Sequence, residues 1–456
     1  MPMGLKNSYW VSSGFYSLGA RLSTLFFGFG SFYFLVRNVQ NMPPAEYGTW
    51  ALFLTITTII ETSRNGLIQN ALIKLIYSSA PENVDKIVTA SWIINIFYSL
   101  LIFVILAAFG GVAGSIFEAP ELQTMFLYYG ATLFLLIPFS QFNFIQQAKF
   151  SFSGIFWSTT TRQGLLFFGT LYLCFSGMSF NSVTLVTLQT FCTLAGLIVA
   201  WFSARKFYTY HFIFDKLAVK EVFRFGKYVM GTNLSSLLFK SIDQLMVGSF
   251  FSTAAAAIYN TAIRLSNLIE YPTTAIAEVV YPKSAQKYTE GKEASAKNFF
   301  EKSVGLNMAI TVPTVIGTFL FADLIIYIIA GAPYAEAANI LRITILFGLF
   351  TPFFRQFGIS MDSSGRPQIN FIVLASSVPI NLLCNFVGIR LWGIPGAATG
   401  TLLSYAIVTI ACYVLMVRIF KIELKNIITS MFGYYAQGFR YFQKSLRVIL
   451  RRPAQQ

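Results

Sequence analysis

The sequence predicts an all-α polytopic membrane protein, and three observations support this fold class. Hydrophobic residues make up 55% of the 456 residues and charged residues only 11%, whereas an ordinary soluble domain is about one quarter charged. Apolar stretches of about 20 residues, the length that crosses a bilayer, recur from Tyr9 to Phe420. The breaks between them are short, so little chain is left for a soluble domain.

Twelve such stretches follow one another along the chain. The predicted spans are residues 9–36, 47–73, 91–113, 122–147, 154–176, 183–204, 224–250, 255–281, 303–322, 336–360, 369–389 and 396–420. They predict two parallel six-helix bundles around a central cavity. The corresponding domains are an N-terminal bundle at 1–205, a cytoplasmic linker at 206–223, a C-terminal bundle at 224–420 and a basic tail at 421–456.

The net charge of +15 follows the predicted topology. With both termini inside, only Arg37 and Arg390 fall on the outside among the basic residues of the connections. The inside connections hold Lys74, Lys86, Lys149, Arg205, Lys206, Lys216, Lys220, Lys283, Lys287, Lys292, Lys297 and Arg366. Cytoplasmic loops of membrane proteins carry this excess of Lys and Arg. The charge therefore indicates a cytoplasmic (inner) membrane with cytoplasmic termini, and it does not indicate a nucleic-acid partner.

The basic tail has a helical pattern of its own. Its apolar residues are Phe432, Tyr435, Phe439, Phe442, Leu446 and Ile449, and its opposite face carries Arg440, Lys444, Arg447 and Arg451. A helix of this kind lies in the membrane interface with its basic face on anionic headgroups. A partly disordered positive tail that only fixes the topology fits the same residues.

An internal repeat relates the two halves. Residues 33–52 align with residues 245–264 and place Tyr47 on Tyr259, while Pro138-Phe139 aligns with Pro352-Phe353. Both offsets are close to 213 residues. Six spans return the chain to its starting side, so the halves are expected to be parallel repeats about an axis along the membrane normal. Such architectures usually transport a substrate.

Charged and polar residues cluster at membrane depth. The substrate-binding candidates are Arg21, Arg64, Lys240, Arg264, Asn267, Tyr271 and Arg355, and the ion-coupling candidates are Glu61, Asp243, Glu270 and Glu278. Ionisable residues cost roughly 2.5–3.5 kcal/mol at mid-bilayer and usually face a bundle interior or water. With Arg162 and Arg342 included, seven basic residues stand against four acidic ones, which predicts a cationic cavity for an anionic cargo.

Structural roles compete with transport at several of these positions. Glu61 with Arg64, and Lys240 with Asp243, are three residues apart and could neutralise each other along one helix. Transport is the favoured role for Arg21, Arg64, Lys240 and Arg264, whereas both roles stay open for Glu270, Glu278 and Arg355. Arg162 and Arg342 are expected to reach water from span ends.

Catalytic and cofactor chemistry has no recognisable motif in this sequence. There is no nucleotide-binding G-x-x-x-x-G-K-[ST] loop, and the single histidine, His211, falls in the predicted linker. Cys174, Cys192, Cys384 and Cys412 lack metal-ligand spacing. We therefore predict no catalytic residue, no metal and no cofactor. A glycosyltransferase or ligase that consumes a lipid-linked sugar is an alternative, although the short exterior loops disfavour it.

Motifs along the chain resemble the Wzx-type polysaccharide and O-antigen flippase family, within the superfamily that includes multidrug extruders and lipid II flippases. The similar segments, which extend over roughly Tyr9 to Phe420, are Ala45-Glu46-Tyr47-Gly48, Gln146-Gln147-Ala148-Lys149-Phe150, Phe225-Gly226-Lys227-Tyr228, Asp243-Gln244-Leu245-Met246, Ala257-Ile258-Tyr259-Asn260, Tyr281-Pro282 and Gly365-Arg366-Pro367. Each motif is weak alone, but their order and spacing are fairly specific.

The resemblance implies a flippase that moves an oligosaccharide on polyprenyl pyrophosphate to the outer leaflet by alternating access. It also implies arginines on the first, second and eighth helices, which match Arg21, Arg64 and Arg264 by position. The expected partners are the lipid-linked oligosaccharide, membrane lipids and polysaccharide polymerase or assembly proteins, and a monomer is expected. The alternative within the superfamily is a cation-coupled multidrug extruder, which the positive balance disfavours. The chain is too short for the two extra helices of lipid II flippases.

Overall fold

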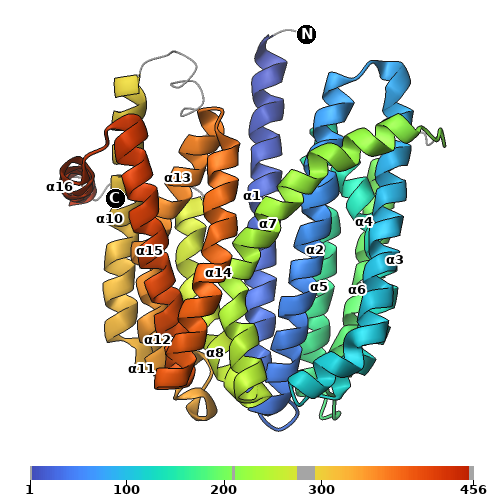
Figure 1. Cartoon of the computed structure of the whole chain (residues 1–456), viewed down its shortest axis with the longest axis horizontal. Helices are drawn as coiled ribbons and strands as arrows, with labels where there is room; N and C mark the ends of the chain where they lie inside the picture. Colours follow the sequence, from blue (N-terminus) through green and yellow to red (C-terminus); the bar gives the residue numbers. More distant parts are fainter. Residues whose placement is uncertain (1–2, 208–210, 275–292, 451–456) are drawn as a thin grey trace, which may run out of the picture. The chain divides into compact units, whose positions relative to one another are not determined.

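A computed structural model describes residues 3–207, 211–274 and 293–450, and all regular elements in these ranges are helical (Figure 1). The long helices of the first half are α1 (Met3–Arg37), α2 (Pro44–Ser78), α3 (Val84–Ile116), α4 (Glu121–Ala148), α5 (Phe152–Phe175), α6 (Ser182–Ala204) and α7 (Lys216–Phe250). They are followed by α8 (Thr253–Ser266), α10 (Glu293–Leu320), α11 (Ala322–Ile329), α12 (Ala337–Thr344), α13 (Thr351–Ser363), α14 (Pro367–Trp392), α15 (Ile394–Phe420) and α16 (Leu424–Leu450).

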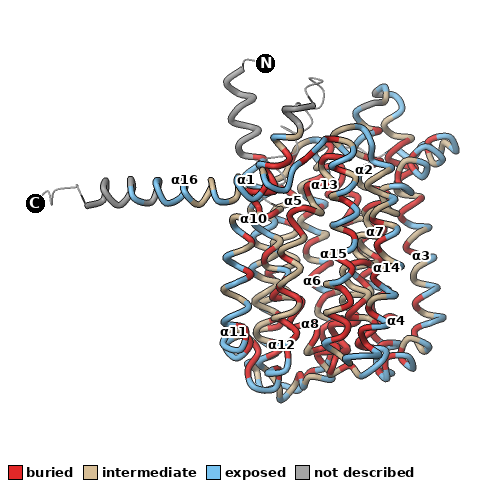
Figure 2. Tube along the Cα trace, turned by 60° about the vertical axis from the view of Figure 1, so that its left-hand side comes forward, coloured by how far each residue is buried: buried red, intermediate tan, exposed pale blue. Residues whose placement is uncertain are grey.

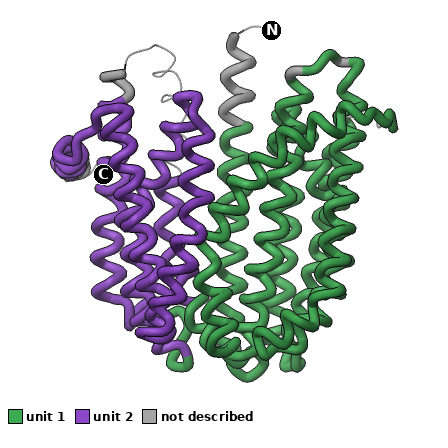
Figure 3. The backbone as a smooth tube through the Cα atoms, viewed as in Figure 1, with its two compact units in different colours: residues 1–260, 329–333 green, residues 261–328, 334–456 purple. Residues whose placement is uncertain are grey.

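The chain divides into two compact units (Figure 3). Unit 1 contains Met1–Asn260 and Ile329–Pro333, and unit 2 contains Thr261–Ile328 and Tyr334–Gln456. Helix α7 thus belongs to unit 1 by its contacts. The domain boundaries expected from the sequence rest on an internal repeat, which contacts do not test, and they stay a prediction.

Eight of the described helical segments are long and apolar enough to cross a membrane. They are Ser13–Arg37, Val84–Ile116, Glu121–Ala148, Ser182–Ala204, Lys297–Leu320, Ala337–Ser363, Pro367–Trp392 and Ile394–Phe420, and each coincides with a predicted span. The chain is therefore a multi-pass membrane protein. The other four predicted spans fall on α2, α5, α7 and α8, which carry most of the charged candidates.

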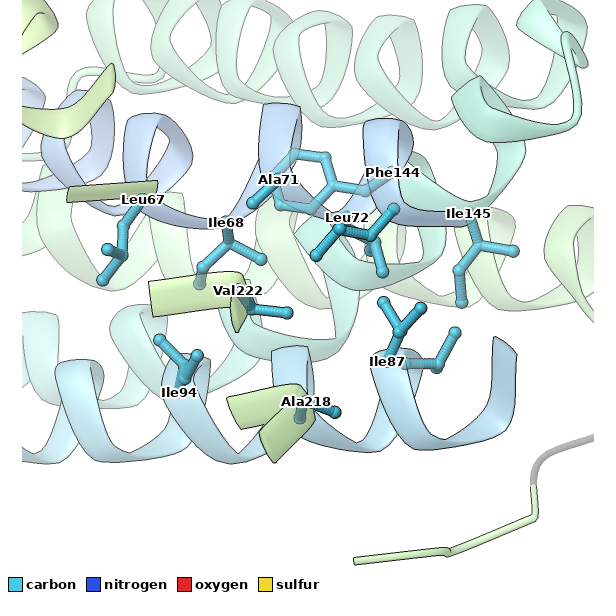
Figure 4. Close-up of a cluster of buried hydrophobic side chains, with 13 residues drawn as sticks. Leu67, Ile68, Ala71, Leu72, Ile87, Ile94, Phe144, Ile145, Ala218 and Val222 are labelled. Atoms are coloured by element: carbon cyan, nitrogen blue, oxygen red, sulfur yellow. The ribbon is translucent and has the colours of Figure 1, made fainter. Parts of the chain in front are cut away.

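The core of unit 1 joins four helices (Figure 4). Ile68, Ala71 and Leu72 of α2 pack with Val222 of α7, and α3 and α4 complete the cluster with Ile87, Ile94, Phe144 and Ile145. Burial of such side chains contributes about 25 cal/mol per Å² of apolar surface in water. In lipid the stabilisation comes from close packing, because lipid chains are as apolar as these side chains.

Glycines set the distance between α2 and α7. A Cβ atom at Gly226 would lie 1.8 Å from the carbonyl oxygen of Leu67, and a Cβ at Gly66 would lie 3.0 Å from the Cα of Met230. Small residues allow membrane helices to approach at the backbone. The contact between α2 and α7 therefore depends on these two glycines.

Unit 2 contains a similar approach between α14 and α15. A Cβ at Gly388 would lie 2.2 Å from the Gly396 carbonyl oxygen. Asn385 donates to Asn381 at 2.8 Å and accepts from Thr401 at 3.1 Å, and all three side chains are buried. Hydrogen bonds between buried amides and hydroxyls satisfy groups that lipid cannot.

The predicted span at 336–360 is interrupted in the structure. A 3-10 turn, Ile345–Leu349, separates α12 from α13, and Pro352 stands in the first turn of α13. Proline has no backbone N–H and cannot continue the helix from the preceding turn. Because of this break, the side-chain directions on α13 do not continue the helical spacing of α12.

We predict that Gly226→Val destabilises the protein by at least about 2 kcal/mol, because overpacking of this size forces helices apart. The measurement is thermal unfolding of the purified protein in detergent. Gly317→Ala is the matched control, because a Cβ there meets nothing within 4 Å. An unchanged melting temperature in Gly226→Val would show that α2 and α7 are not in close contact.

Candidate functional site

The sequence candidates lie in both units. Unit 1 holds Arg21 on α1, Glu61 and Arg64 on α2, and Lys240 and Asp243 on α7. Unit 2 holds Arg264, Asn267, Glu270 and Tyr271 along and just after α8, and Arg355 on α13. Glu278 lies outside the described residues.

The most distinctive of these residues is Arg64. Its exposed fraction is 2%, and it is the largest fully buried side chain of the part of the chain that the structure describes. Its Nε and Nη1 atoms have no hydrogen-bond partner. A buried guanidinium group normally has its donors satisfied, because leaving water costs several kcal/mol per ion. Arg64 therefore holds unused donors in a desolvated position.

Four side chains from other turns and helices form the electrostatic surroundings of Arg64. Glu61, Tyr129 of α4, Arg162 of α5 and Tyr98 of α3 all interact with it electrostatically. Tyr129 donates to Glu61 Oε1 at 3.0 Å, and Arg162 Nη2 lies 3.9 Å from the same oxygen. Glu61 thus contacts Tyr129 and Arg162 directly. It interacts electrostatically with Arg64 of its own helix, but the direct contacts of its carboxylate are with the other two side chains.

The position of Arg162 corrects the sequence analysis. It was expected to reach water from a span end, but it lies in the middle of α5 with its side chain 14% exposed. Its guanidinium carbon is 5.6 Å from the centre of the Phe139 ring. Two guanidinium groups and one carboxylate leave the group formed by Glu61, Arg64, Tyr129 and Arg162 with one net positive charge. We call this group the Arg64 cluster.

Asp243 has a different environment. It is 1% exposed and accepts hydrogen bonds from Tyr259 at 2.7 Å and from the Gln244 backbone N–H at 2.8 Å. Asn260 donates to Gln244 at 3.0 Å and accepts from Tyr47 at 2.9 Å. These bonds join α2, α7 and α8, so the geometry favours a structural role for Asp243 over ion coupling.

In unit 2, Arg355 pairs with Glu270. Arg355 Nη2 lies 3.2 Å from Glu270 Oε2, and its Nη1 donates to Thr274. Both charged side chains are 23% exposed. The pair neutralises itself, which favours the structural interpretation that the sequence left open. Arg342 also pairs, with Asp323 at the start of α11.

Three of the remaining candidates, Arg264, Asn267 and Tyr271, lie on α8 and in the turns that follow it in unit 2. Asn267 and Tyr271 are exposed and Arg264 is partly exposed. Tyr271 and Arg264 interact electrostatically. Arg21 is likewise exposed on α1, and Lys240 is partly exposed on α7. The structure leaves these side chains accessible within their own units.

Metal and redox chemistry finds no support in the described residues. No group of three His, Cys, Asp or Glu side chains lies close enough to hold a metal ion among them, and the four cysteines are free thiols. An apolar cavity of about 500 Å³ in unit 1 is lined by Trp92, Phe142 and Trp201. It contains none of the predicted site residues.

A known protein family matches the part of the chain that holds most of the residues described above. Residues 42–339 match a family described as polysaccharide biosynthesis protein, a range that includes α2 to α8 and the Arg64 cluster. The chain belongs to this polysaccharide biosynthesis family.

Teichuronic acid biosynthesis protein TuaB of Bacillus subtilis is 24% identical over 362 residues, which cover 75% of this chain and 70% of TuaB. The probable low-salt glycan biosynthesis flippase Agl15 of Haloferax volcanii is 24% identical over 191 residues, 42% of this chain. The chain thus spans only 40% of the length of Agl15 in that match.

Solved structures share the helical fold of this chain. The lipid II flippase MurJ in an inward closed conformation has a TM-score of 0.71, with 15% identity, over 95% of this chain and 93% of that chain. An inward-facing multidrug resistance MATE transporter has a TM-score of 0.73, with 15% identity, over 86% of this chain and 93% of that chain. At this identity the likeness concerns the helical fold alone.

The Arg64 cluster predicts stability effects of opposite sign. Arg64→Met removes a desolvated cation and is expected to leave thermal stability unchanged or raise it, because apolar residues often replace buried charges without loss. Glu61→Gln removes the only carboxylate of the cluster and is expected to destabilise by about 3 kcal/mol. Thermal unfolding in detergent measures both. If Arg64→Met is the more destabilising change, the guanidinium supports the fold and its donors are satisfied.

Proposed function

We propose that this chain is a flippase that translocates a polyprenyl-pyrophosphate-linked oligosaccharide from the cytoplasmic to the outer leaflet of the cytoplasmic membrane. The product would serve the synthesis of a cell-surface polysaccharide. The proposal includes twelve spans in two six-helix bundles, both termini in the cytoplasm and alternating access. Membership of the polysaccharide biosynthesis family supports the general function, and the names of the relatives support flipping as the activity.

The observation that carries the proposal is the Arg64 cluster. Arg64 combines full burial with unused donors at Nε and Nη1. A guanidinium group binds two phosphate oxygens at once, and such charge-assisted hydrogen bonds are about twice as strong as neutral ones. A pyrophosphate group would supply the acceptors that the protein does not. Arg64 would then be a preformed anion site, because its guanidinium group is already desolvated before the ligand binds.

The other candidates have supporting roles in this proposal. Arg162 adds a second cation to the cluster, and Glu61 limits the net charge so that the anion can also leave. Arg21, Lys240, Arg264, Asn267 and Tyr271 are proposed to contact the glycan or phosphates from accessible faces. Glu61 is the proposed coupling group of unit 1, because its side chain is 23% exposed, whereas Asp243, the other acidic candidate of that unit, is 1% exposed and accepts a hydrogen bond from Tyr259.

Depletion of the protein from its host is expected to leave complete lipid-linked repeat units on the cytoplasmic leaflet. Mass spectrometry of polyprenyl-linked intermediates, with an impermeant glycan-modifying reagent to report the leaflet, measures this. Accumulation on the outer leaflet would instead identify a ligase. An unchanged pool would contradict the proposal and direct attention to the export of cationic compounds.

Arg64→Met and Arg64→Lys test the anion site itself. Loss of a charge-assisted hydrogen bond costs about 1.5–3 kcal/mol, so transport by Arg64→Met is expected to fall at least about tenfold. Arg64→Lys retains the charge but loses the fork and is expected to recover transport only in part. Arg418→Met, which removes an exposed arginine at the end of α15, is the control. Equal transport by all three variants and wild type would eliminate the site.

A further inference from the structure

The last helix, α16, is fixed to unit 2 by a buried carboxylate. Glu301 of α10 is 3% exposed. Its two oxygens accept from the Glu423 backbone N–H at 2.8 Å and from Asn426 Nδ2 at 3.1 Å. Glu423 immediately precedes α16 and Asn426 lies in its first turn, where free N–H groups and the helix dipole favour a negative charge. Glu301 thus caps a helix that follows it by more than a hundred residues.

A lysine strengthens the same junction. Lys297 Nζ lies 2.6 Å from Glu423 Oε1 and 3.9 Å from Glu301 Oε1. The hydrogen bond from Lys297 lowers the pKa of the Glu423 carboxyl. Glu423 is therefore ionised at neutral pH. Its bond to Lys297 weakens only when the pH falls below the ordinary pKa of a glutamate carboxyl.

The backbones of α10 and α16 also come close together. A Cβ at Gly305 would lie 2.8 Å from Ser430 Cβ and 3.0 Å from the Ile427 carbonyl oxygen. Ile422 and Ile427 are buried at 3% and 0% exposure. The first turns of α16 are therefore a packed part of unit 2, and they determine the direction of the whole helix.

Figure 2 shows α16 leaving the side of unit 2, at a steep angle to α10 and α15. Helix α15 is an apolar span that ends at Phe420, and α16 begins at Leu424. Lys421, with a φ of 54°, makes the left-handed turn between them. Since α15 crosses the hydrocarbon, α16 must begin at the boundary between hydrocarbon and headgroups.

The two faces of α16 differ in chemistry. Beyond the contact with α10, Ile428, Phe432 and Phe439 are 42%, 60% and 61% exposed. By helical spacing these residues share a stripe with Leu424 and Tyr435, whereas Arg440 lies toward the opposite face and Lys425 at the edge of the stripe. The sequence continues the same spacing, with Phe442, Leu446 and Ile449 in line with the apolar stripe and Lys444 and Arg447 in line with Arg440. Arg451 lies outside the described residues.

We infer that α16 is a membrane-surface helix that binds anionic phospholipids at the leaflet where α15 ends. Its aromatic stripe enters the acyl region and its basic face contacts the headgroups, as in interfacial amphipathic helices. The contact through Glu301, Lys297 and Gly305 transmits this anchoring to α10. The depth of unit 2 in the membrane is therefore fixed relative to one leaflet. The inference concerns lipid binding and stands whether or not the chain is a flippase.

Site-directed spin labelling tests the orientation of α16 in the full-length protein. Labels at Phe439→Cys and Gln437→Cys, two exposed positions on opposite sides of the helix, are compared in a background without the four native cysteines. The vesicles contain phosphatidylcholine with about one quarter phosphatidylglycerol. The Phe439 label is expected to collide with oxygen and the Gln437 label with a water-soluble nickel chelate. Equal exposure of both labels to the nickel chelate would overturn the inference.

Two further outcomes of the same measurement would also overturn it. A Phe439 label that is shielded from both reagents would indicate that protein covers the stripe. A short distance between Phe439 labels of two molecules, measured by pulsed electron paramagnetic resonance, would identify that protein as a second copy of this chain. The lipid inference requires an oxygen-accessible label and no such distance.

The headgroup preference has a separate test that does not use transport. Spin-labelled phosphatidylglycerol and phosphatidylcholine report the relative association of each lipid with the reconstituted protein. The triple variant Arg440→Gln, Lys444→Gln and Arg447→Gln is expected to lose most of the preference for phosphatidylglycerol, with up to about fivefold per cation. The charge-matched control is Lys86→Gln, Lys149→Gln and Arg366→Gln, three basic residues at the ends of other helices. An equal loss in the control would show that the preference does not arise from α16.

Discussion

The close approach of α2 and α7 is the constraint on which unit 1 depends. Gly66 and Gly226 bring the two backbones together, and the apolar residues that follow on α2 join α3, α4 and α7 in one core. Arg64 is two residues before Gly66. Residues two apart on an α-helix point to different sides, so Arg64 lies on another side of α2 than the contact with α7, near Tyr129 of α4 and Arg162 of α5. The unit that packs around α2 carries the desolvation cost of Arg64. Unfavourable features such as a desolvated charge are often retained at functional sites.

Much of the fold could be predicted because lipid restricts the backbone to helices with internal hydrogen bonds. Apolar length therefore located α4, α6, α14 and α15 within a few residues, and it missed the first turns of α3. It could not locate the interruption between α12 and α13, where Gly348 and Pro352 act within an otherwise apolar stretch. The assignment of α7 to unit 1 was also hidden, because it depends on glycine contacts between residues far apart in sequence.

The candidate site was predictable in part for a related reason. Arg64 and Glu61 stand out because charges at membrane depth are rare. Tyr129 is one of 23 tyrosines, and only the position of α4 beside α2 gives it a role. Arg162 was misjudged from its supposed place near a span end. The partner of Glu270 is Arg355, 85 residues away, and no pattern along one helix could reveal that pair.

The central claim is that Arg64 is a preformed site for a phosphate group, and ligand-dependent stability tests it most directly. A ligand that binds only the folded protein raises its unfolding temperature, and the rise increases with the logarithm of the ratio of ligand concentration to Kd. Polyprenyl pyrophosphate added to the purified protein is predicted to raise the melting temperature of wild type and Arg418→Met, but not of Arg64→Met. An equal rise in Arg64→Met would contradict the account, because the anion would then bind without this guanidinium group.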